Sequence, residues 1–245
     1  MKKSKIRIYI NKKISSNLLI YIKNKQHHYL KNVMRIQINE SIKIFDGLTG
    51  EWLSSVLSIN RDSTVLRVIE KTNNIVKGLD VWLIFAPIKQ HRMSIAIQKA
   101  TELGVSKIFP CITKYTNLKK VNINNLQLNA IEAAEQSERL DVPKIENPIE
   151  LNLLLDSWPK DRHLIFCEEK GNCNNNIVES LLTLKNNNNK KWGVLVGPEG
   201  GFSAAEKDLI NNNKCAITVS LGKRVLRSDT AITVSLYCVQ ELINK

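Results

Sequence analysis

From residue 81 onward, short apolar runs alternate with segments whose apolar residues recur at helical spacing. Met93, Ile97, Ala100 and Leu103 are three or four residues apart, which predicts one face of a helix that ends at Gly104. Strands separated by helices are typical of an α/β domain with a mostly parallel sheet. We expect strands at Val81–Ala86, Ile108–Ile112, Leu164–Cys167, Trp192–Val196 and Cys215–Val219, and further helices over residues 124–138 and 230–242.

The first 70 residues have a different pattern, with short strands and little helix. Ile6–Ile10 alternates as a strand does, and a Gly-containing turn separates Ser41–Phe45 from Glu51–Ile59, which predicts a hairpin. A short helical piece over residues 28–34 precedes this hairpin, and another strand follows at Thr64–Ile69. Such a series predicts a small barrel. Because residues 71–79 are polar and unpatterned, we expect a β-barrel domain of residues 1–71 and an α/β domain of residues 72–245.

The charge of the chain is strongly positive and unevenly distributed. The formal net charge is +13, and residues 1–70 hold 13 basic and 5 acidic residues. Such asymmetry suggests that a polyanion binds the N-terminal part, although a lysine-rich composition without any partner would look the same.

Other compositional features exclude several classes of protein. The longest apolar stretch, Val81–Ile88, is too short to span a bilayer, and the basic N-terminus lacks the apolar region of a signal peptide, so we expect a cytoplasmic protein. Five cysteines without a C-x-x-C pair, and four histidines without metal spacing, predict neither a disulfide framework nor a metal site. We interpret the cysteines as small core residues.

One strand of the α/β domain runs directly into a glycine-rich loop. Residues 192–203 read WGVLVGPEGGFS, and Ser203 with Glu206 forms the capping-box pattern of a helix start. Glycines at the carboxyl end of a strand allow a ligand to approach the backbone, and open α/β sheets bind ligands at this edge. A tight strand-to-helix turn would explain the same glycines. The loop is neither a dinucleotide fingerprint nor a P-loop.

A second strand leaves through a glycine and leads into the last helix. Residues 220–231 read SLGKRVLRSDTA, with Gly222 and two arginines. Arg227 follows an apolar Val225–Leu226 pair that we expect to be buried, so that the arginine points into a pocket. An arginine there suits an anionic or enolate-like group, whereas an ion pair between Arg227 and Asp229 is the structural alternative.

Residues 197–203 and 221–231 together resemble the paired motifs of SPOUT-class RNA methyltransferases, and more narrowly those of the ribosomal RNA small subunit methyltransferase E family. Residues 27–35 with 45–47 are similar to the PUA-like barrel of that family, and residues 93–105 and 132–139 are similar to blocks of its catalytic domain. The resemblance covers essentially the whole chain. Lys223, Ser228–Asp229 and Tyr115 differ from the usual family residues, which are proline, Thr-Glu and arginine.

The resemblance implies a function and a fold. Family members methylate N3 of a specific uridine in 16S rRNA of the small ribosomal subunit, with S-adenosylmethionine as the methyl donor. It also implies an α/β SPOUT domain with a parallel sheet and a deep trefoil knot, beside the PUA-like barrel, in a homodimer with no metal and no membrane partner. The alternatives are a SPOUT methyltransferase acting on another RNA atom and a non-catalytic RNA-binding ribosome-assembly factor.

The resemblance and the charge pattern also assign candidate site residues. The catalytic candidates are Arg227, to stabilise a uracil anion, and Asp229 and Glu199, to orient the arginine or take the proton. The expected cofactor-binding residues are Leu195, Gly197, Gly200, Gly201, Leu221, Gly222 and Leu226. The expected RNA-binding residues are Arg7, Lys23, Lys25, Lys31 and Arg35.

Overall fold

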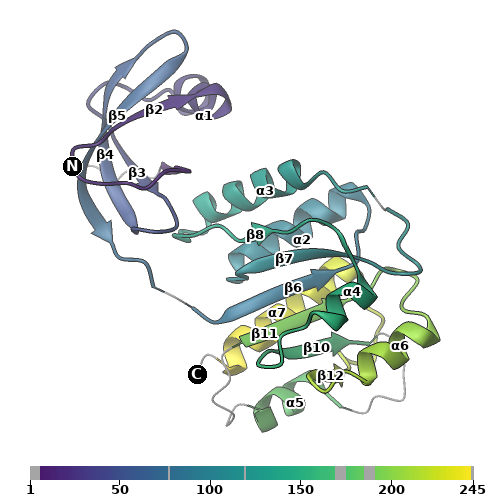
Figure 1. Cartoon of the computed structure of the whole chain (residues 1–245). Helices are drawn as coiled ribbons and strands as arrows, with labels where there is room; N and C mark the ends of the chain where they lie inside the picture. The colour runs from purple at the N-terminus through teal and green to yellow at the C-terminus, as the bar shows by residue number, and fades with distance from the viewer. Residues whose placement is uncertain (1–5, 77, 119, 169–174, 185–190, 244–245) are drawn as a thin grey trace. The chain divides into compact units, whose positions relative to one another are not determined.

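The computed structural model describes residues 6–76, 78–118, 120–168, 175–184 and 191–243 (Figure 1). They form two compact units, one of residues 1–77 with residues 134–142, the other of residues 78–133 and 143–245. Strand β5 (Ser63–Asn73) continues past the boundary expected at residue 71. Among the described residues, no helix is long and apolar enough to cross a membrane.

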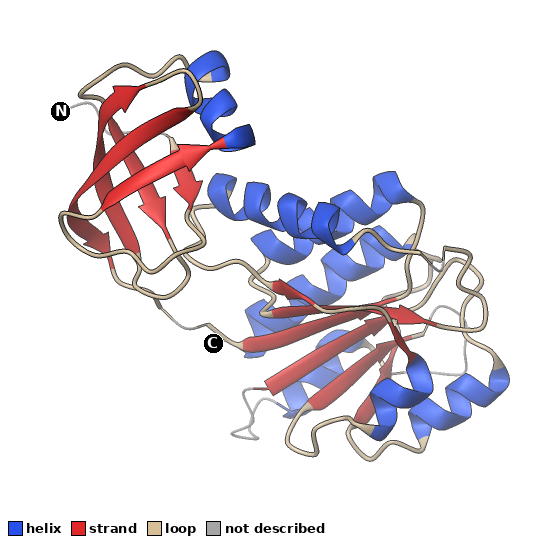
Figure 2. Cartoon of the chain, turned by 45° about the horizontal axis from the view of Figure 1, so that its top comes forward, coloured by secondary structure: helices blue, strands red, loops and turns tan. Residues whose placement is uncertain are grey.

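The N-terminal unit is a curled five-stranded sheet (Figure 2). Its strands β1 (Arg7–Tyr9), β2 (Leu19–Lys23), β3 (Ser41–Phe45), β4 (Glu51–Ile59) and β5 lie in the order β1-β3-β4-β5-β2. Only β1 and β3 are parallel. The β4–β5 pairing shifts register at three places, and such bulges increase the twist that lets a small sheet curl. The predicted hairpin is β3–β4.

The curled sheet encloses its own apolar core, together with the short helices α1 (Asn24–His28) and η1 (Tyr29–Val33). Sequence analysis missed strand β2. Its residues alternate in burial, but Leu19 and Tyr21 are exposed beside the buried Ile20 and Ile22, so apolar residues lie on both faces and hide the period of two. The core residues are Ile8, Ile10, Ile14, Ile20, Ile22, Leu30, Ile36, Ile42, Ile44, Val56, Leu66 and Val68.

A buried arginine joins β1 to residues 134–142 within this unit. Arg7 is 7% exposed, and its Nε donates to a carboxylate oxygen of Glu51 at 3.0 Å. Its two terminal nitrogens donate to the carbonyls of Ala134, Glu135 and Arg139 at 3.1–3.3 Å. The first two of these carbonyls belong to the last turn of helix α3 (Ile123–Gln136), where backbone acceptors lack helical partners. Arg7 is among the residues expected to contact RNA, but its guanidinium is buried and already bonded inside the protein.

The C-terminal unit contains a parallel sheet in the order β12-β10-β11-β6-β7-β8, with β9 pairing the far part of β7. This arrangement confirms the predicted α/β class; the trefoil knot stays a prediction. The strands are β6 (Asp80–Phe85), β7 (Lys107–Ile112), β8 (Lys144–Ile145), β9 (Ile149–Glu150), β10 (His163–Cys167), β11 (Lys191–Val196) and β12 (Ala216–Val219).

Helices cover both faces of the parallel sheet (Figures 1 and 2). Helices α2 (Gln90–Glu102), α5 (Ile177–Leu184) and α7 (Ser228–Ile243) pack together on one face, while α4 (Leu151–Asp156) and α6 (Ala204–Asn211) pack together on the other. The helices expected near residues 93–104, 124–138 and 230–242 are confirmed as α2, α3 and α7. Sequence analysis missed the short helices α4 and α5.

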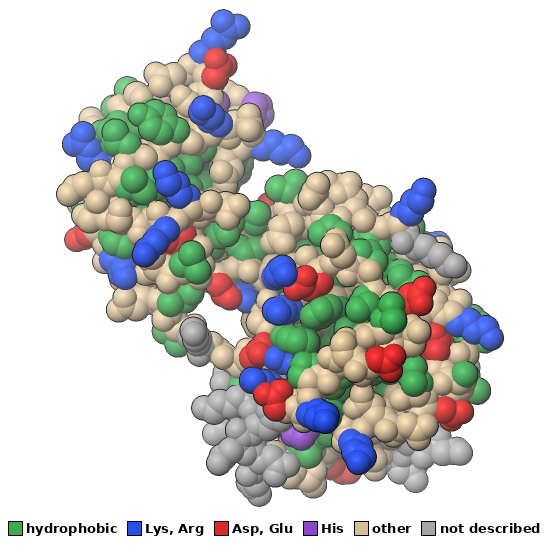
Figure 3. All heavy atoms as spheres, in the orientation of Figure 1, with side chains coloured by type: hydrophobic (Ala, Val, Ile, Leu, Met, Phe, Trp, Pro, Cys, Tyr) green, Lys and Arg blue, Asp and Glu red, His purple; other side chains and the backbone are tan. Residues whose placement is uncertain are grey.

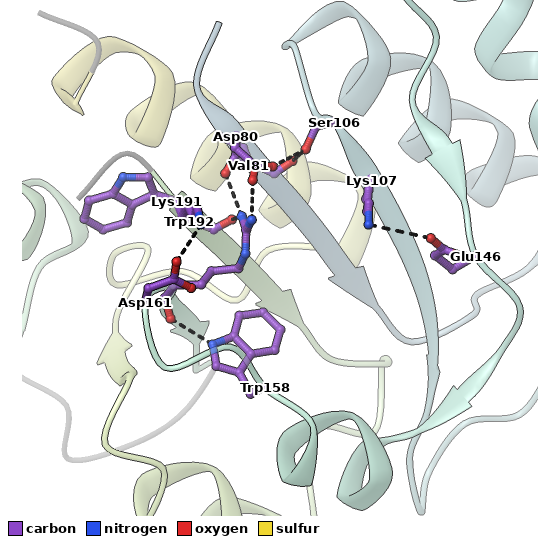
Figure 4. Close-up of polar contacts among 10 residues, drawn as sticks. Asp80, Val81, Ser106, Lys107, Glu146, Trp158, Asp161, Lys191 and Trp192 are labelled. Atoms are coloured by element: carbon purple, nitrogen blue, oxygen red, sulfur yellow. Dashed lines mark hydrogen bonds and ion pairs between the residues drawn. The ribbon is translucent and has the colours of Figure 1, made fainter.

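A cluster of charged and aromatic side chains lies at the amino ends of β6, β10 and β11 (Figure 4). Arg162 pairs with Asp80 and donates to the carbonyls of Asp80 and Trp192 at 2.7 and 2.9 Å, and its guanidinium lies 3.7 Å from the ring centroid of Trp82. Burial alone raises the pKa of Asp80, but hydrogen bonds from Arg162 and Ser106 outweigh it and leave the pKa lowered. These contacts join the start of β10 to its neighbours at the edge away from the glycine loops.

Candidate functional site

A cleft lies at the carboxyl ends of three neighbouring strands, β10, β11 and β12. Because the strands are parallel and adjacent, the loops that leave them meet at one edge of the sheet. Both predicted glycine loops contribute to this cleft, which confirms that they share one site. Its lining residues are Cys167, Glu168, Val196, Gly197, Pro198, Glu199, Gly200, Gly201, Phe202, Lys207, Leu221, Gly222, Arg224, Leu226 and Ala231.

Hydrogen bonds fix the two loops in place. The predicted capping box is present at the start of α6, where Ser203 N–H donates to Glu206 Oε2 at 2.8 Å and Glu206 N–H donates to Ser203 Oγ at 3.4 Å. Ser228 Oγ, at the start of α7, donates to the Gly197 carbonyl at 3.0 Å and so links the second loop to the first. The two loops that border the cleft are therefore hydrogen-bonded to the starts of α6 and α7.

The glycines serve two different purposes. Gly201 and Gly222 have φ of +69° and +116°, and a β-carbon on either would meet no atom within 4 Å, so they provide left-handed turns beside open space. A β-carbon on Gly197 would instead lie 2.5 Å from the Phe202 ring, and one on Gly200 would lie 3.0 Å from Cβ of Tyr115. A side chain at position 197 would clash with Phe202, and one at position 200 would require Tyr115 to move slightly, so packing against protein favours glycine at both.

Charged side chains surround the cleft. The Lys207 ammonium lies 2.5 Å from a Glu168 carboxylate oxygen, and Arg92 of α2 lies 3.5 Å from the Glu199 carboxylate. Burial raises the pKa of the Cys167 thiol to about 12, so this cysteine lines the cleft as a neutral group and not as a nucleophile. The cysteine interpretation holds for the buried Cys111 and Cys167; Cys215 and Cys238 are half-buried, and Cys173 lies outside the described residues.

The structure places most of the predicted cofactor residues together, with one correction. Gly197, Gly200, Gly201, Leu221, Gly222 and Leu226 all line the cleft. Leu195 is instead 1% exposed and packs in the core under α4 and α6. Side chains alternate along a strand, so the next residue, Val196, lines the cleft in its place.

The catalytic candidates lie at different places around the cleft. Glu199 lines it, whereas Arg227 is exposed and precedes the first residue of α7, directly after the lining residue Leu226. Among the described residues, no ion pair joins Arg227 to Asp229, and the buried Oδ1 of Asp229 has no hydrogen-bond partner. The expected burial of Val225 is wrong, since this side chain is 58% exposed.

The remaining RNA-binding candidates lie on the N-terminal unit. Lys23, Lys25 and Arg35 are exposed, and the half-buried Lys31 donates its ammonium to the Asn60 carbonyl at 3.0 Å. Figure 3 shows lysine and arginine side chains spread over the visible face of this unit. The three exposed cations can meet phosphates, unlike Arg7.

Four charged or polar residues of the cleft are not among the predicted site residues: Cys167, Glu168, Lys207 and Arg224, the other arginine of the second loop. Glu168 directly follows the predicted strand at 164–167, so its position at a carboxyl end could have been predicted. The strands on either side of Glu168 could not be predicted, because the sequence does not reveal that β10 lies between β11 and β12 in the sheet.

Comparisons with known proteins agree with this architecture. A family model described as an RNA methyltransferase domain matches residues 76–240, and one described as an RNA methyltransferase PUA domain matches residues 22–69. Ribosomal RNA small subunit methyltransferase E of Rickettsia conorii is 34% identical over 96% of this chain and 95% of its own length. The chain belongs to the ribosomal RNA small subunit methyltransferase E family.

Other family members are similar over their whole length. The family member from Buchnera aphidicola subsp. Schizaphis graminum is 28% identical over 98% of this chain and 97% of its own. A crystal structure of a ribosomal RNA small subunit methyltransferase E from Neisseria gonorrhoeae, bound to S-adenosyl methionine, has a TM-score of 0.85, 25% identity and 97% coverage of both chains.

Proposed function

We propose that this protein transfers a methyl group from S-adenosylmethionine to N3 of a uridine in 16S rRNA of the small ribosomal subunit. The observation that carries the proposal is the cleft formed by the two glycine loops at the carboxyl ends of β10, β11 and β12. Membership of the family and the S-adenosyl methionine bound by the Neisseria gonorrhoeae relative support it.

The residues of the cleft fit a nucleoside-type cofactor. Open space beside the backbone at Gly201 and Gly222 provides room for a flat group, and Leu221, Leu226 and Ala231 supply apolar walls. When bound, S-adenosylmethionine supplies a methyl group on a positively charged sulfur, and the thioether that leaves needs no acid. The protein's part is therefore mainly to orient the reacting groups.

The nucleophile requires more help than the leaving group. Uridine N3 carries a proton at neutral pH, and its removal places negative charge on the uracil oxygens. We assign the stabilisation of that charge to Arg227, which directly follows the lining residue Leu226 and whose guanidinium stays protonated at every working pH. Asp229, with its unpartnered carboxylate oxygen, and Glu199 are the candidates to take the proton or orient the arginine.

The basic N-terminal unit would bind rRNA phosphates and position the substrate. Neutralising Lys23, Lys25, Lys31 and Arg35 together is expected to flatten the slope of log affinity against log salt, by roughly 0.7–0.9 for each phosphate that is no longer neutralised. Filter binding to small-subunit particles at four salt concentrations measures the slope. Neutralising the exposed Lys120, Lys160 and Lys214 of the other unit is the control; an equal flattening there would contradict the assignment.

The proposal extends to assembly and location. A homodimer, as the family resemblance implies, is checked by sedimentation equilibrium, with a monomer as the contradicting result. Acting on ribosomal subunits, the enzyme would work in the cytoplasm, and neither a metal nor a membrane partner enters the reaction.

The direct test is transfer of a labelled methyl group in vitro. Small subunits reconstituted with an unmodified 16S transcript are incubated with the enzyme and radiolabelled S-adenosylmethionine, with reconstituted large subunits as the control. We expect label in 16S rRNA only, on the uracil ring. Label on ribose would favour a methyltransferase for another RNA atom, whereas RNA binding without cofactor binding in calorimetry would favour an assembly factor.

A further inference from the structure

A four-residue turn at the carboxyl end of β7 is fixed to the first glycine loop. Within the turn, Thr113 N–H donates to Thr116 Oγ1 at 2.9 Å, and Thr116 N–H donates to the Thr113 carbonyl at 3.1 Å. The N–H of Lys114 donates to Glu206 Oε1 at 2.7 Å, while the other oxygen of Glu206 accepts from Ser203 in the capping box. One carboxylate therefore holds both the turn and the end of the loop.

The turn places an aromatic side chain against a residue that lines the cleft. A β-carbon built on Gly200, a lining residue, would lie 3.0 Å from Cβ and 3.6 Å from Cγ of Tyr115. Tyr115 nevertheless remains 43% exposed. The base of the Tyr115 side chain thus packs against the first glycine loop, while much of the side chain is exposed to solvent. Hydrogen bonds of the neighbouring residues fix the turn that carries Tyr115, so less backbone entropy is lost when a flat ligand stacks on its ring.

Positive charge accompanies this ring. The Lys114 ammonium lies 5.7 Å from the centroid of the Tyr115 ring, and Arg92 pairs at 3.5 Å with Glu199, the residue before Gly200. An aromatic face beside cations is the combination that binds unpaired nucleotides, because the ring stacks on the base and the cations meet the phosphates.

We propose that Tyr115 is a substrate-binding residue that stacks on the uracil presented to the cleft, with Lys114 contacting an adjacent phosphate. This inference rests on the proposed function. N3 lies on the base-pairing edge, so the uridine must leave its stack before it can react, and unstacking costs free energy. The Tyr115 ring replaces part of the lost stacking at the place where the base is needed.

The test compares ring-removing and ring-keeping substitutions. Tyr115→Leu retains apolar packing on Gly200 but removes the ring, and it should weaken equilibrium binding to small subunits reconstituted with unmodified 16S transcript by about fivefold or more. Tyr115→Phe and Tyr115→Trp keep a ring and should restore binding to within about threefold of the wild type. Asn117→Leu, an exposed neighbour in the same segment, is the matched control.

Two further measurements separate the outcomes. S-adenosylmethionine affinity by calorimetry should stay within about twofold in every variant, because Tyr115 is not among the residues that line the cleft. Three results would each overturn the inference. Tyr115→Leu could bind the particles as tightly as the wild type, the Leu and Phe variants could lose equal particle affinity, or cofactor affinity could fall in parallel with particle affinity. An inactive wild-type enzyme would overturn the proposed function instead, while particle binding would still report on stacking.

Discussion

Arg227→Ala is expected to lower turnover by about 10²–10³, the scale for losing one preorganised electrostatic donor. Arg227 is exposed and directly follows the lining residue Leu226, one residue before the start of α7. Its contact with uracil oxygens strengthens as N3 loses its proton, so the effect falls on the chemical step and not on substrate binding. Cofactor affinity should change little.

Two comparisons make the Arg227 prediction specific. Lysine at this position should rescue only part of the rate, because it lacks the two-pronged donor geometry of arginine. Raising the pH should partly restore the alanine variant, since a larger fraction of uridine is then ionised without help. Single-turnover methylation of small subunits at two pH values measures both the rescue by lysine and the rescue by raised pH. If Arg227→Ala binds the cofactor weakly but methylates at the wild-type rate when the cofactor is saturating, Arg227 has a structural role instead.

Arg7→Ala is expected to reduce the free energy of unfolding by about 3–5 kcal/mol, the usual cost of removing one partner of a buried ion pair. The substitution leaves Glu51 in a buried position and removes the donors to three carbonyls of residues 134–139. Urea unfolding followed by circular dichroism measures the loss. Lys12→Ala, an exposed neighbour, is the control, and a similar small change in both variants would contradict the prediction.

The same network has a predictable pH dependence. Burial raises the pKa of Glu51, but hydrogen bonds from Lys43, Thr72 and Arg7 outweigh it, so the net pKa is lowered from its ordinary value of 4.5. A carboxyl with a lowered pKa stabilises the fold above its unfolded-state pKa, and this stability is lost as the pH falls through the folded-state value. Stability should therefore decrease more steeply below pH 4.5 in the wild type than in Arg7→Ala.

Local patterns in the sequence predicted most elements of the C-terminal unit. The helical spacing of Met93, Ile97 and Ala100 and the Ser203–Glu206 capping box depend only on residues close in the chain, and both are present in the structure. The grouping of the two glycine loops also followed, because consecutive parallel strands end at one edge.

Features that depend on distant contacts could not be predicted. The strand order places β10 between β11 and β12, and this order brings Glu168 and Lys207 into the cleft. Arg7 looked like any other basic residue near the N-terminus, since its partners lie 44 and 127–132 residues away. Gly197 looked like a ligand-approach glycine, whereas its neighbour is the Phe202 ring.

The most direct test of the proposed function maps methylated nucleosides in 16S rRNA by mass spectrometry, in a strain lacking the gene and in the same strain with the gene restored. We predict that one 3-methyluridine is absent from the deletion strain and returns with the wild-type gene but not with Arg227→Ala. An unchanged set of methylated nucleosides, or loss of a methyl group from ribose, would contradict the proposal.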